Sequence, residues 1–409
     1  MSPSHARTRQ TLARHGQLPR PHPVRQLLAL LGIGLATVLV AGAGVVAFAV
    51  NDLYSALTED AVQIGDDAVP PGITELDDRG VSILLLGLDI CERDYAAIMG
   101  DRCRDKEYGD DGRELVANSD VVMLLHISPE PRRVTVLSFP RDLMVDLPVC
   151  ETESGEEDGG YFGQLNSAYA IGGLACSAAA VEELTGLPVD HAASITWGGV
   201  IGLTSAIGGV TVCVETPIHD PEAGAYFEAG EHTIDGVRAL EFLRTRHGLE
   251  GGSDLARIGN QQVYMAALVR KLMSEETLSD WGRLFALART AVRAIEPSTG
   301  LTDPVYLARV ALAVRNVPLS DFRFVRFPVY DWPQDPDRVV ADEVNAATLI
   351  QSIRDNTEFA PQPGSGSVPT EGAEPTEGAT PPPSASPTAQ PDNVYGQTAD
   401  ETRCSAGNG

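Results

Sequence analysis

The sequence lacks the short motifs that mark several large enzyme classes. It contains no Gly-rich Walker loop, no G-x-S-x-G elbow, no H-E-x-x-H helix and no Cys–His pairing, so the reactions that depend on those motifs have no support. It contains neither a C-x₂-C pair nor a His-x₃-His spacing, which argues strongly against a zinc site. Internal repeats are absent as well.

Basic charge is also scarce. The chain has 30 Lys and Arg residues against 57 Asp and Glu residues, for a net charge of −27. The first 50 residues carry +5, so residues 51–409 carry −32. A chain this acidic is not expected to bind nucleic acid through a broad basic surface, so arginines that cluster inside it stand out.

Charged side chains are missing altogether from Leu27 to Val50, a stretch of mostly Leu, Ala, Val, Gly and Ile. As a helix it is long enough to cross the ~30 Å hydrocarbon layer of a membrane. Five arginines and no acidic residue precede it, which predicts a cytoplasmic N-terminus and an extracellular domain after a single pass. The competing interpretation is a cleaved signal peptide, which usually has a shorter apolar region and a clearer cleavage site.

All the cysteines follow this segment: Cys91, Cys103, Cys150, Cys176, Cys213 and Cys404. An even number of cysteines in an exported domain predicts disulfide bonds. Cys91 and Cys103 enclose a short, charged, loop-like stretch, so we expect them to pair. The other four can pair in three ways, and all three remain open.

Composition divides the chain into five parts. We expect residues 1–26 to form a basic cytoplasmic tail, 27–50 a transmembrane helix, 51–80 a connector, 81–358 an extracellular globular domain and 359–409 a Pro-, Ser- and Thr-rich disordered tail. The last assignment rests on residues 361–391, whose low-complexity composition cannot bury enough apolar surface to fold.

Within residues 81–358, short apolar runs predict strands and longer segments predict helices. Strands are expected at Ser82–Leu88, Val121–Ile127, Val134–Phe139, Gly209–Glu215 and Phe322–Phe327, the second and third forming a hairpin. Helices are expected at Asn166–Gly186 (interrupted at Gly172-Gly173), Trp197–Ile207, Ser253–Met273, Trp281–Ile295, Pro304–Arg315 and Asp342–Arg354. The mixture predicts an α/β (α+β mixed) class with one central mixed sheet flanked by helices.

Arginines follow two segments that we expect to be extended. Arg141 and Asp142 come directly after the strand Val134–Phe139, at the rim of a sheet, where clefts form; a surface ion pair is the alternative. Arg244 and Arg246 should point to the same side of an extended chain, where two guanidinium groups repel unless an anion lies between them. This pair therefore favours a phosphate site, and we expect His247 to cap the strand end.

A helix and a strand end complete the pattern. Ser253 can cap a helix on which Asp254, Arg257 and Gln261 share one face at i, i+3 and i+7, although a solvated polar stripe has the same spacing. Asp120 precedes a buried strand and could hold Mg²⁺ together with substrate phosphates, although a turn aspartate is the alternative. Together these residues predict one arginine-lined pocket.

The chain resembles the LytR–CpsA–Psr family of membrane-anchored cell-wall phosphotransferases, which is spread across Gram-positive bacteria. The resemblance covers about Ser82 to Met273, and continues more weakly to about Arg354. Its motifs occur in family order: LLLGLD at 84–89, NSDVVMLLHI at 118–127, VTVLSFPRDLMVDLP at 134–148, LNSAYAIGG at 165–173, AIGGVTVCVE at 206–215, TIDGVRALEFLRTRHG at 233–248 and SDLARIGNQQ at 253–262. Asn118 departs from the family, which usually has Arg there.

The resemblance implies an enzyme that transfers a glycopolymer, or its linkage unit, from a polyprenyl-pyrophosphate carrier to peptidoglycan through a phosphodiester bond. It implies Mg²⁺ or Mn²⁺ as the cofactor, held by Asp120 and Asp254, and an apolar tunnel for the lipid. The implied catalytic residues are Arg141, Asp254 and Asp120. The residues implied to bind the pyrophosphate are Arg141, Arg244, Arg246, Arg257 and Gln261.

Two other functions fit the same residues. A pyrophosphatase or phosphodiesterase would pass the phosphate to water, and a non-catalytic wall-binding or regulatory protein would not need the arginines. Transfer is favoured because displacing a lipid phosphate requires fixed cations around the departing charge and little covalent help from the protein.

Overall fold

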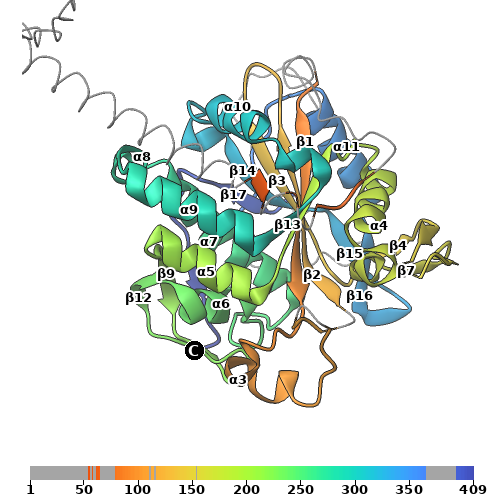
Figure 1. Ribbon diagram of the computed structural model, residues 1–409, viewed down its shortest axis with the longest axis horizontal. Helices are drawn as coiled ribbons and strands as arrows, with labels where there is room; N and C mark the ends of the chain where they lie inside the picture. The colour runs from red at the N-terminus through yellow and green to blue at the C-terminus, as the bar shows by residue number, and fades with distance from the viewer. Residues whose placement is uncertain are drawn as a thin grey trace, which may run out of the picture. The chain divides into compact units, whose positions relative to one another are not determined.

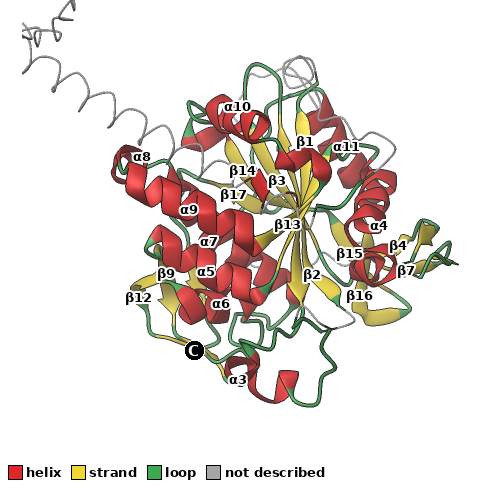
Figure 2. Cartoon of the chain, in the orientation of Figure 1, coloured by secondary structure: helices red, strands yellow, loops and turns green. Residues whose placement is uncertain are grey.

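A seven-stranded mixed sheet forms the centre of the part of the chain that the computed structural model describes: residues 54–55, 58, 61–64, 79–109, 112–114, 117–152, 154–364 and 393–409. Its strands lie in the order β13-β8-β1-β2-β3-β14-β17 (Figure 1; Figure 2). In chain order they are β1 (Val81–Asp89), β2 (Asn118–Ile127), β3 (Val134–Phe139), β8 (His191–Ile195), β13 (Ile295–Pro297), β14 (Phe322–Arg326) and β17 (Gly396–Thr398).

The pairing of these strands places one acidic side chain at the end of the sheet. β2 and β3 form the expected antiparallel hairpin, and β1 lies antiparallel to β2 and parallel to β8. A bulge shifts the register of β1 and β2, so that Gly87 lies opposite Val121 and Leu88 opposite Ser119. Asp120 is the additional residue of this bulge, an irregularity that commonly re-aims a side chain.

Helices cover both faces of this sheet (Figure 2). Leu84 and Leu86 of β1 pack in one cluster with α4 and α11, whereas Ile83 packs in another with α7 and α10. This division follows from the alternation of side chains along a strand. The α-helices that lie in the described ranges are α3 (Ala96–Met99), α4 (Ala168–Thr185), α5 (Trp197–Ile207), α6 (Gly236–Arg244), α7 (Asp254–Leu272), α8 (Glu275–Ser279), α9 (Trp281–Ala294), α10 (Pro304–Val314) and α11 (Glu343–Arg354).

A second, smaller sheet packs against α6 and α7. It contains β12 (Gly230–Ile234), β9 (Val210–Thr216) and β18 (Cys404–Ala406), with β9 in the middle. Four two-stranded pairs complete the described sheets: β4 (Met144–Asp146) with β7 (Phe162–Gln164), β5 (Cys150–Glu151) with β6 (Glu157–Asp158), β10 (Ile218–Asp220) with β11 (Ala225–Phe227), and β15 (Val329–Trp332) with β16 (Asp335–Ala341). Short 3₁₀ turns occur at η1 (Gly100–Cys103), η2 (Leu165–Ser167), η3 (Thr299–Thr302) and η4 (Leu319–Asp321).

The predicted helices are confirmed to within a residue or two. α4 is interrupted where expected, because Gly172 and Gly173 adopt non-helical backbone angles and Gly173 has a φ of 60°. Such a φ is strained for residues with a Cβ atom. The predicted cap of α7 is confirmed as well, since the Ser253 hydroxyl accepts a hydrogen bond from the Ala256 N–H.

The assignment of residues 359–409 to a disordered tail is wrong for residues 393–409. Within this segment β17 pairs with β14 as an edge strand of the central sheet, and β18 pairs with β9. The partners of both strands lie far away in the sequence, and each strand is only three residues long, so local periodicity gives no signal. The strand β8 was not predicted, because its sequence HAASI contains two alanines, which are depleted in strands, and only one β-branched residue.

Three disulfide bonds join the six cysteines. Cys91–Cys103 is confirmed. The remaining pairs are Cys150–Cys176 and Cys213–Cys404, the second of which ties β9 to β18 across 191 positions of sequence. The disulfides therefore hold both the loop after β1 and the C-terminal strands.

The predicted transmembrane helix 27–50, the tail 1–26 and most of the connector 51–80 lie outside the described residues. Within the described ranges, no helix has both the length and the apolar character needed to span a membrane.

Candidate functional site

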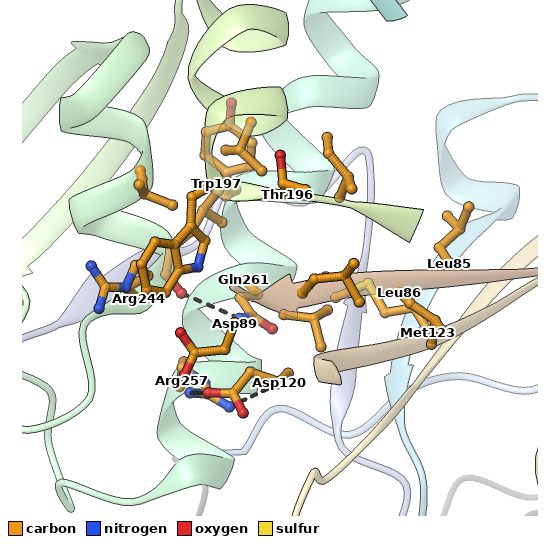
Figure 3. Close-up of a pocket in the computed structure, with 18 of the residues that line it drawn as sticks. Leu85, Leu86, Asp89, Asp120, Met123, Thr196, Trp197, Arg244, Arg257 and Gln261 are labelled. Atoms are coloured by element: carbon orange, nitrogen blue, oxygen red, sulfur yellow. Dashed lines mark hydrogen bonds and ion pairs between the residues drawn. The ribbon is translucent and has the colours of Figure 1, made fainter. Parts of the chain in front are cut away.

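A cavity of about 530 Å³ opens between the ends of β1, β2 and β8 and the helices α5, α6 and α7. Figure 3 shows its two kinds of surface, with Leu85, Leu86 and Met123 at one side and Arg257, Asp120 and Asp89 at the other. Six of the seven predicted site residues line it: Asp120, Arg141, Arg244, Arg246, Arg257 and Gln261.

Two arginines and two aspartates form an ion-pair network at the polar end. The Arg141 Nη1 atom lies 2.7 Å from Asp120 Oδ2, and the Arg257 Nη2 atom lies 2.6 Å from Asp254 Oδ1. Crossed contacts of 3.5 Å between Arg141 and Asp254 and 3.6 Å between Arg257 and Asp120 close the network. Each guanidinium is thus held between two carboxylates that come from different parts of the sequence.

Burial and the neighbouring charges of this network shift the pKa values of Arg141 and Asp254. Burial lowers the pKa of Arg141, but the carboxylates of Asp120, Asp254 and Asp142 raise it more, so the pKa lies above its ordinary value. Burial raises the pKa of Asp254 above its ordinary value, and Arg257 and Arg141 oppose that rise only in part. Both oxygens of Asp254 are enclosed and lack a well-aligned hydrogen bond.

Local structure explains how these side chains meet. Pro140 ends β3 and places Arg141 at the rim of the sheet, as the sequence predicts. Ser253 fixes the start of α7, so Asp254 lies in its first turn and Arg257 one turn later on the same face. The Gln261 side chain lies a further turn on, where its Nε2 donates to the Leu243 carbonyl and joins α7 to α6.

Arg244 and Arg246 occupy a different local structure from the one predicted. Arg244 is the last residue of α6, and the extended chain begins only at Thr245, because the helix continues through the apolar residues that precede Arg244. The Arg244 guanidinium stacks on Trp197, 4.4 Å from the ring centre. Burial lowers the pKa of Arg244, and Asp89 partly offsets this effect. Arg246 nevertheless lines the same cavity.

His247 does not cap a strand. Its ring is half exposed, and its Nε2 atom lies 2.8 Å from an Arg246 nitrogen and 3.4 Å from Glu222. The chain here forms a turn between α6 and α7, so no strand end is available to cap.

Asp220 holds this turn in place, and sequence reasoning missed it. One carboxylate oxygen accepts hydrogen bonds from the Thr245 hydroxyl at 2.8 Å, the Arg246 N–H at 2.9 Å and the Gly248 N–H at 3.3 Å. The other oxygen accepts from the N–H groups of the turn that follows β10. Asp220 therefore positions the segment that carries both arginines.

Asp89 is a second residue that the sequence analysis missed. It ends β1, beside the bulge that presents Asp120, and it lines the cavity. Its carboxylate lies 2.8 Å from Arg102. The side chains of Asp89 and Asp120 are 23% and 21% exposed, so both can reach a ligand, whereas Asp254 is enclosed. The position of Asp89 directly after the apolar run LLLGL was the sequence feature that could have indicated a site residue.

Within the described ranges, no group of three or more His, Cys, Asp or Glu side chains is placed to hold a metal ion. Mg²⁺ requires fewer, because it is usually held by one or two carboxylates together with substrate phosphates and water. Asp89 and Asp120, at adjacent strand ends in the same cavity, fit that requirement.

The fold and the cavity define an α/β protein with an arginine-lined, partly apolar binding site. The chain belongs to the LytR_cpsA_psr family, whose model matches residues 49–322. The predicted family is thereby confirmed.

Two curated relatives illustrate the similarity. The chain is 34% identical over 241 residues to the probable cell wall biosynthesis protein LcpB of Corynebacterium glutamicum, with 58% of this chain and 54% of that protein covered. It is 30% identical over 200 residues to the polyisoprenyl-teichoic acid–peptidoglycan teichoic acid transferase TagU of Enterococcus faecalis, with 49% and 56% covered. The chain thus spans about half the length of the curated relatives it matches.

The fold is shared with solved structures. Protein gbs0355 from Streptococcus agalactiae superposes with a TM-score of 0.55 at 20% identity, covering 71% of this chain and 92% of that one. The predicted α/β class with a central mixed sheet and flanking helices is confirmed.

Proposed function

We propose that the protein transfers a glycopolymer, or its linkage unit, from a polyprenyl-pyrophosphate carrier to peptidoglycan and forms a phosphodiester bond. The observation that carries this proposal is a single cavity in which four arginines surround one end and apolar side chains line the other. Such a cavity suits a ligand with an anionic head and a long hydrocarbon tail. The names of the family's curated relatives, which include a peptidoglycan teichoic acid transferase, support the same class of reaction.

The pyrophosphate would lie against Arg244 and Arg246. Neither guanidinium has a carboxylate partner among the described residues, whereas Arg141 and Arg257 are already paired. A planar guanidinium binds phosphate oxygens in a bidentate manner. Arg141 and Arg257 would supply further positive charge from the opposite side, with Gln261 between the two helices.

A divalent cation, Mg²⁺ or Mn²⁺, would be held by Asp120 and Asp89. Bound there, it would neutralise charge that develops on the departing lipid phosphate. The resemblance implies that Asp254 holds the cation together with Asp120, but the enclosed oxygens of Asp254 and its contacts to two guanidinium groups favour a positioning role. Asp254 would hold the Arg257 and Arg141 side chains in position beside the phosphates.

The reaction exchanges one P–O bond for another. A hydroxyl of the acceptor glycan would form a bond to the phosphorus that carries the sugar, the bond from that phosphorus to the lipid phosphate would break, polyprenyl phosphate would leave, and the hydroxyl proton would pass to water. The fixed guanidinium groups stabilise the charge on the leaving group, which is the main contribution a protein makes to such a transfer.

The polyprenyl chain would occupy the apolar part of the cavity, between the sheet and helices α5, α6 and α7. The walls come from Leu85 and Met123 on the sheet, and from Val200, Leu243 and Leu268 on the helices. This compartment would shelter the first isoprene units from water.

The membrane location remains part of the proposal. The uncharged segment Leu27–Val50 and the arginines before it indicate one transmembrane helix with the domain on the outside, where both a lipid carrier and the wall are available. Cysteine-labelling of residues on each side of this segment in intact cells would test the orientation.

The transfer is tested with the full-length chain in detergent, supplied with a polyprenyl-pyrophosphate-linked sugar, Mg²⁺ and peptidoglycan. We expect a phosphodiester-linked product that Arg244→Ala reduces at least tenfold, with the exposed Arg309→Ala as the matched control. Release of sugar phosphate without any acceptor would instead identify a hydrolase. No product from the wild-type chain, together with intact cellular function of Arg244→Ala and Asp120→Ala, would identify a non-catalytic function.

A further inference from the structure

A second cavity, of about 370 Å³, lies against α7 and is closed by the C-terminal strands. Arg257, Gln261 and Tyr264 of α7 line the first cavity, whereas Asn260, Gln262 and Val263 line the second. The two cavities have no lining residue in common, so the second is a separate site.

The second cavity contains a buried arginine that has no counter-ion among the described residues. Arg326, the last residue of β14, is only 3% exposed, and its guanidinium stacks on Tyr395 at 5.0 Å from the ring centre. Within the part of the chain that the structure describes, its Nε and Nη2 atoms have no hydrogen-bond partner and no carboxylate pairs with it. Burial lowers the pKa of Arg326 to about 10, so the side chain remains protonated at neutral pH. An enclosed charge of this kind is normally compensated by an anion.

Neutral polar atoms around the same cavity also lack hydrogen-bond partners in the described ranges. They are the Nε2 atom of Gln262, the Oδ1 atom of Asn260, the Oε1 atom of Gln397 and the Oγ atom of Ser405. Each of these side chains is more than nine-tenths buried. Since buried polar groups in native proteins are nearly always hydrogen-bonded, this set of donors and acceptors indicates a polar ligand rather than packing.

The other charges of the cavity select the kind of anion. Arg403 is already paired with Glu401 at 2.7 Å, which leaves one uncompensated guanidinium. The exposed residues Glu215 and Glu250 also line the cavity and would repel a phosphate dianion, but they would accept hydrogen bonds from hydroxyl or ammonium groups. A monoanion with additional donors matches this arrangement.

We infer that this cavity binds a small hydroxy- or amino-carboxylate, whose carboxylate pairs with Arg326 and whose donors meet Asn260 and Gln397. The inference does not rest on the transferase activity. Cys404 and Ser405 of β18 form part of the wall, so the site exists only when the C-terminal segment is folded and tied to Cys213.

The site is tested by calorimetric titration of the full-length chain in detergent with L-lactate, alanylalanine, the neutral lactamide and inorganic phosphate. We expect lactate or alanylalanine to bind, lactamide to bind at least tenfold more weakly, and phosphate to bind more weakly than the carboxylates. Arg326→Gln should weaken carboxylate binding at least tenfold, whereas Arg309→Gln on the exposed surface of α10 should leave it unchanged.

Since Arg326→Gln removes a buried side chain, a second variant is needed in case the first does not fold. Gln262→Ala should keep the fold and weaken carboxylate binding at least threefold. The inference is overturned if none of the carboxylates binds, if phosphate binds more tightly than they do, or if their affinity survives in both Arg326→Gln and Gln262→Ala.

Discussion

Replacement of Asp220 by asparagine is the sharpest test of how the arginine-bearing turn is held. The carboxylate is 1% exposed and accepts five hydrogen bonds, three from the turn at 245–248 and two from the turn after β10. Asparagine has nearly the same size, so the substitution changes hydrogen bonding and charge rather than packing.

The expected effect follows from counting donors. One terminal atom of asparagine is an NH₂ group, and in either orientation it faces N–H or O–H donors, so at least two hydrogen bonds are lost. A hydrogen bond to a charged group contributes about 1.5–3 kcal/mol. We therefore expect Asp220→Asn to lower the free energy of unfolding by roughly 3–5 kcal/mol, and with a urea m-value of about 3 kcal/mol/M the midpoint should fall by ~1 M or more.

The size of this difference should depend on pH. Burial raises the pKa of Asp220, but hydrogen bonds from Arg246, Thr245, Ala223 and Gly248 lower it more, so the folded pKa is depressed. The stabilisation is therefore complete above the unfolded pKa of about 3.9 and is lost as the pH falls through the folded pKa. The gap between the wild type and the variant should narrow at strongly acidic pH, as measured by urea unfolding followed by circular dichroism.

Asp235→Asn is the matched control, because Asp235 is exposed and its side chain does not cap the helix that follows it. We expect it to change the free energy of unfolding by less than about 0.5 kcal/mol. Equal stability of Asp220→Asn and wild type at neutral pH, or a difference that does not change with pH, would refute the reasoning.

Three further predictions concern stability. Asp254→Ala leaves Arg257 buried without its nearest carboxylate and should lower the free energy of unfolding by about 3–5 kcal/mol, most of which a paired apolar replacement of both residues should recover in a double-mutant cycle. Cys213→Ser with Cys404→Ser opens a loop of 191 positions and should cost about 5 kcal/mol; unchanged urea unfolding would contradict this. Burial lowers the pKa of His126 to about 4, below the unfolded value of about 6.5. The unfolded state therefore binds the proton more readily, and the free energy of unfolding should decrease as the pH falls from about 6.5 to about 4. His126→Gln should make this decrease smaller.

Much of the central sheet could be predicted because its strands are continuous apolar runs. Residues 134–139 are buried throughout, as expected for a strand covered on both faces, and the sequence VTVLSF shows this directly. The helices could be predicted from their caps and glycine interruptions. The strands β8 and β17 could not, since one is rich in alanine and the other depends on a partner far away in the sequence.

Only some of the site residues could be predicted from the sequence. Arginines such as Arg141 and Arg257 attract attention in an acidic chain, and their convergence required only that strand ends and a helix face meet. Asp220 gave no signal, because four of its five hydrogen-bond donors are backbone N–H groups and two of these belong to a segment that local patterns assign wrongly. In the sequence, Arg326 belongs to the alternating run FRFVRF, which predicts only a strand. Its burial depends on the C-terminal segment, which forms part of the cavity wall around it.

The position of β17 has a consequence for biosynthesis. The ribosome adds this strand well after β14, its partner, and until then the outer edge of β14 presents unpaired N–H and C=O groups. A nascent chain in this state could pair with a neighbouring copy through that edge. Production of the protein should therefore benefit from slow synthesis and from chaperones that shield the edge until residues 396–398 emerge, and an expression tag placed within residues 393–409 should increase aggregation.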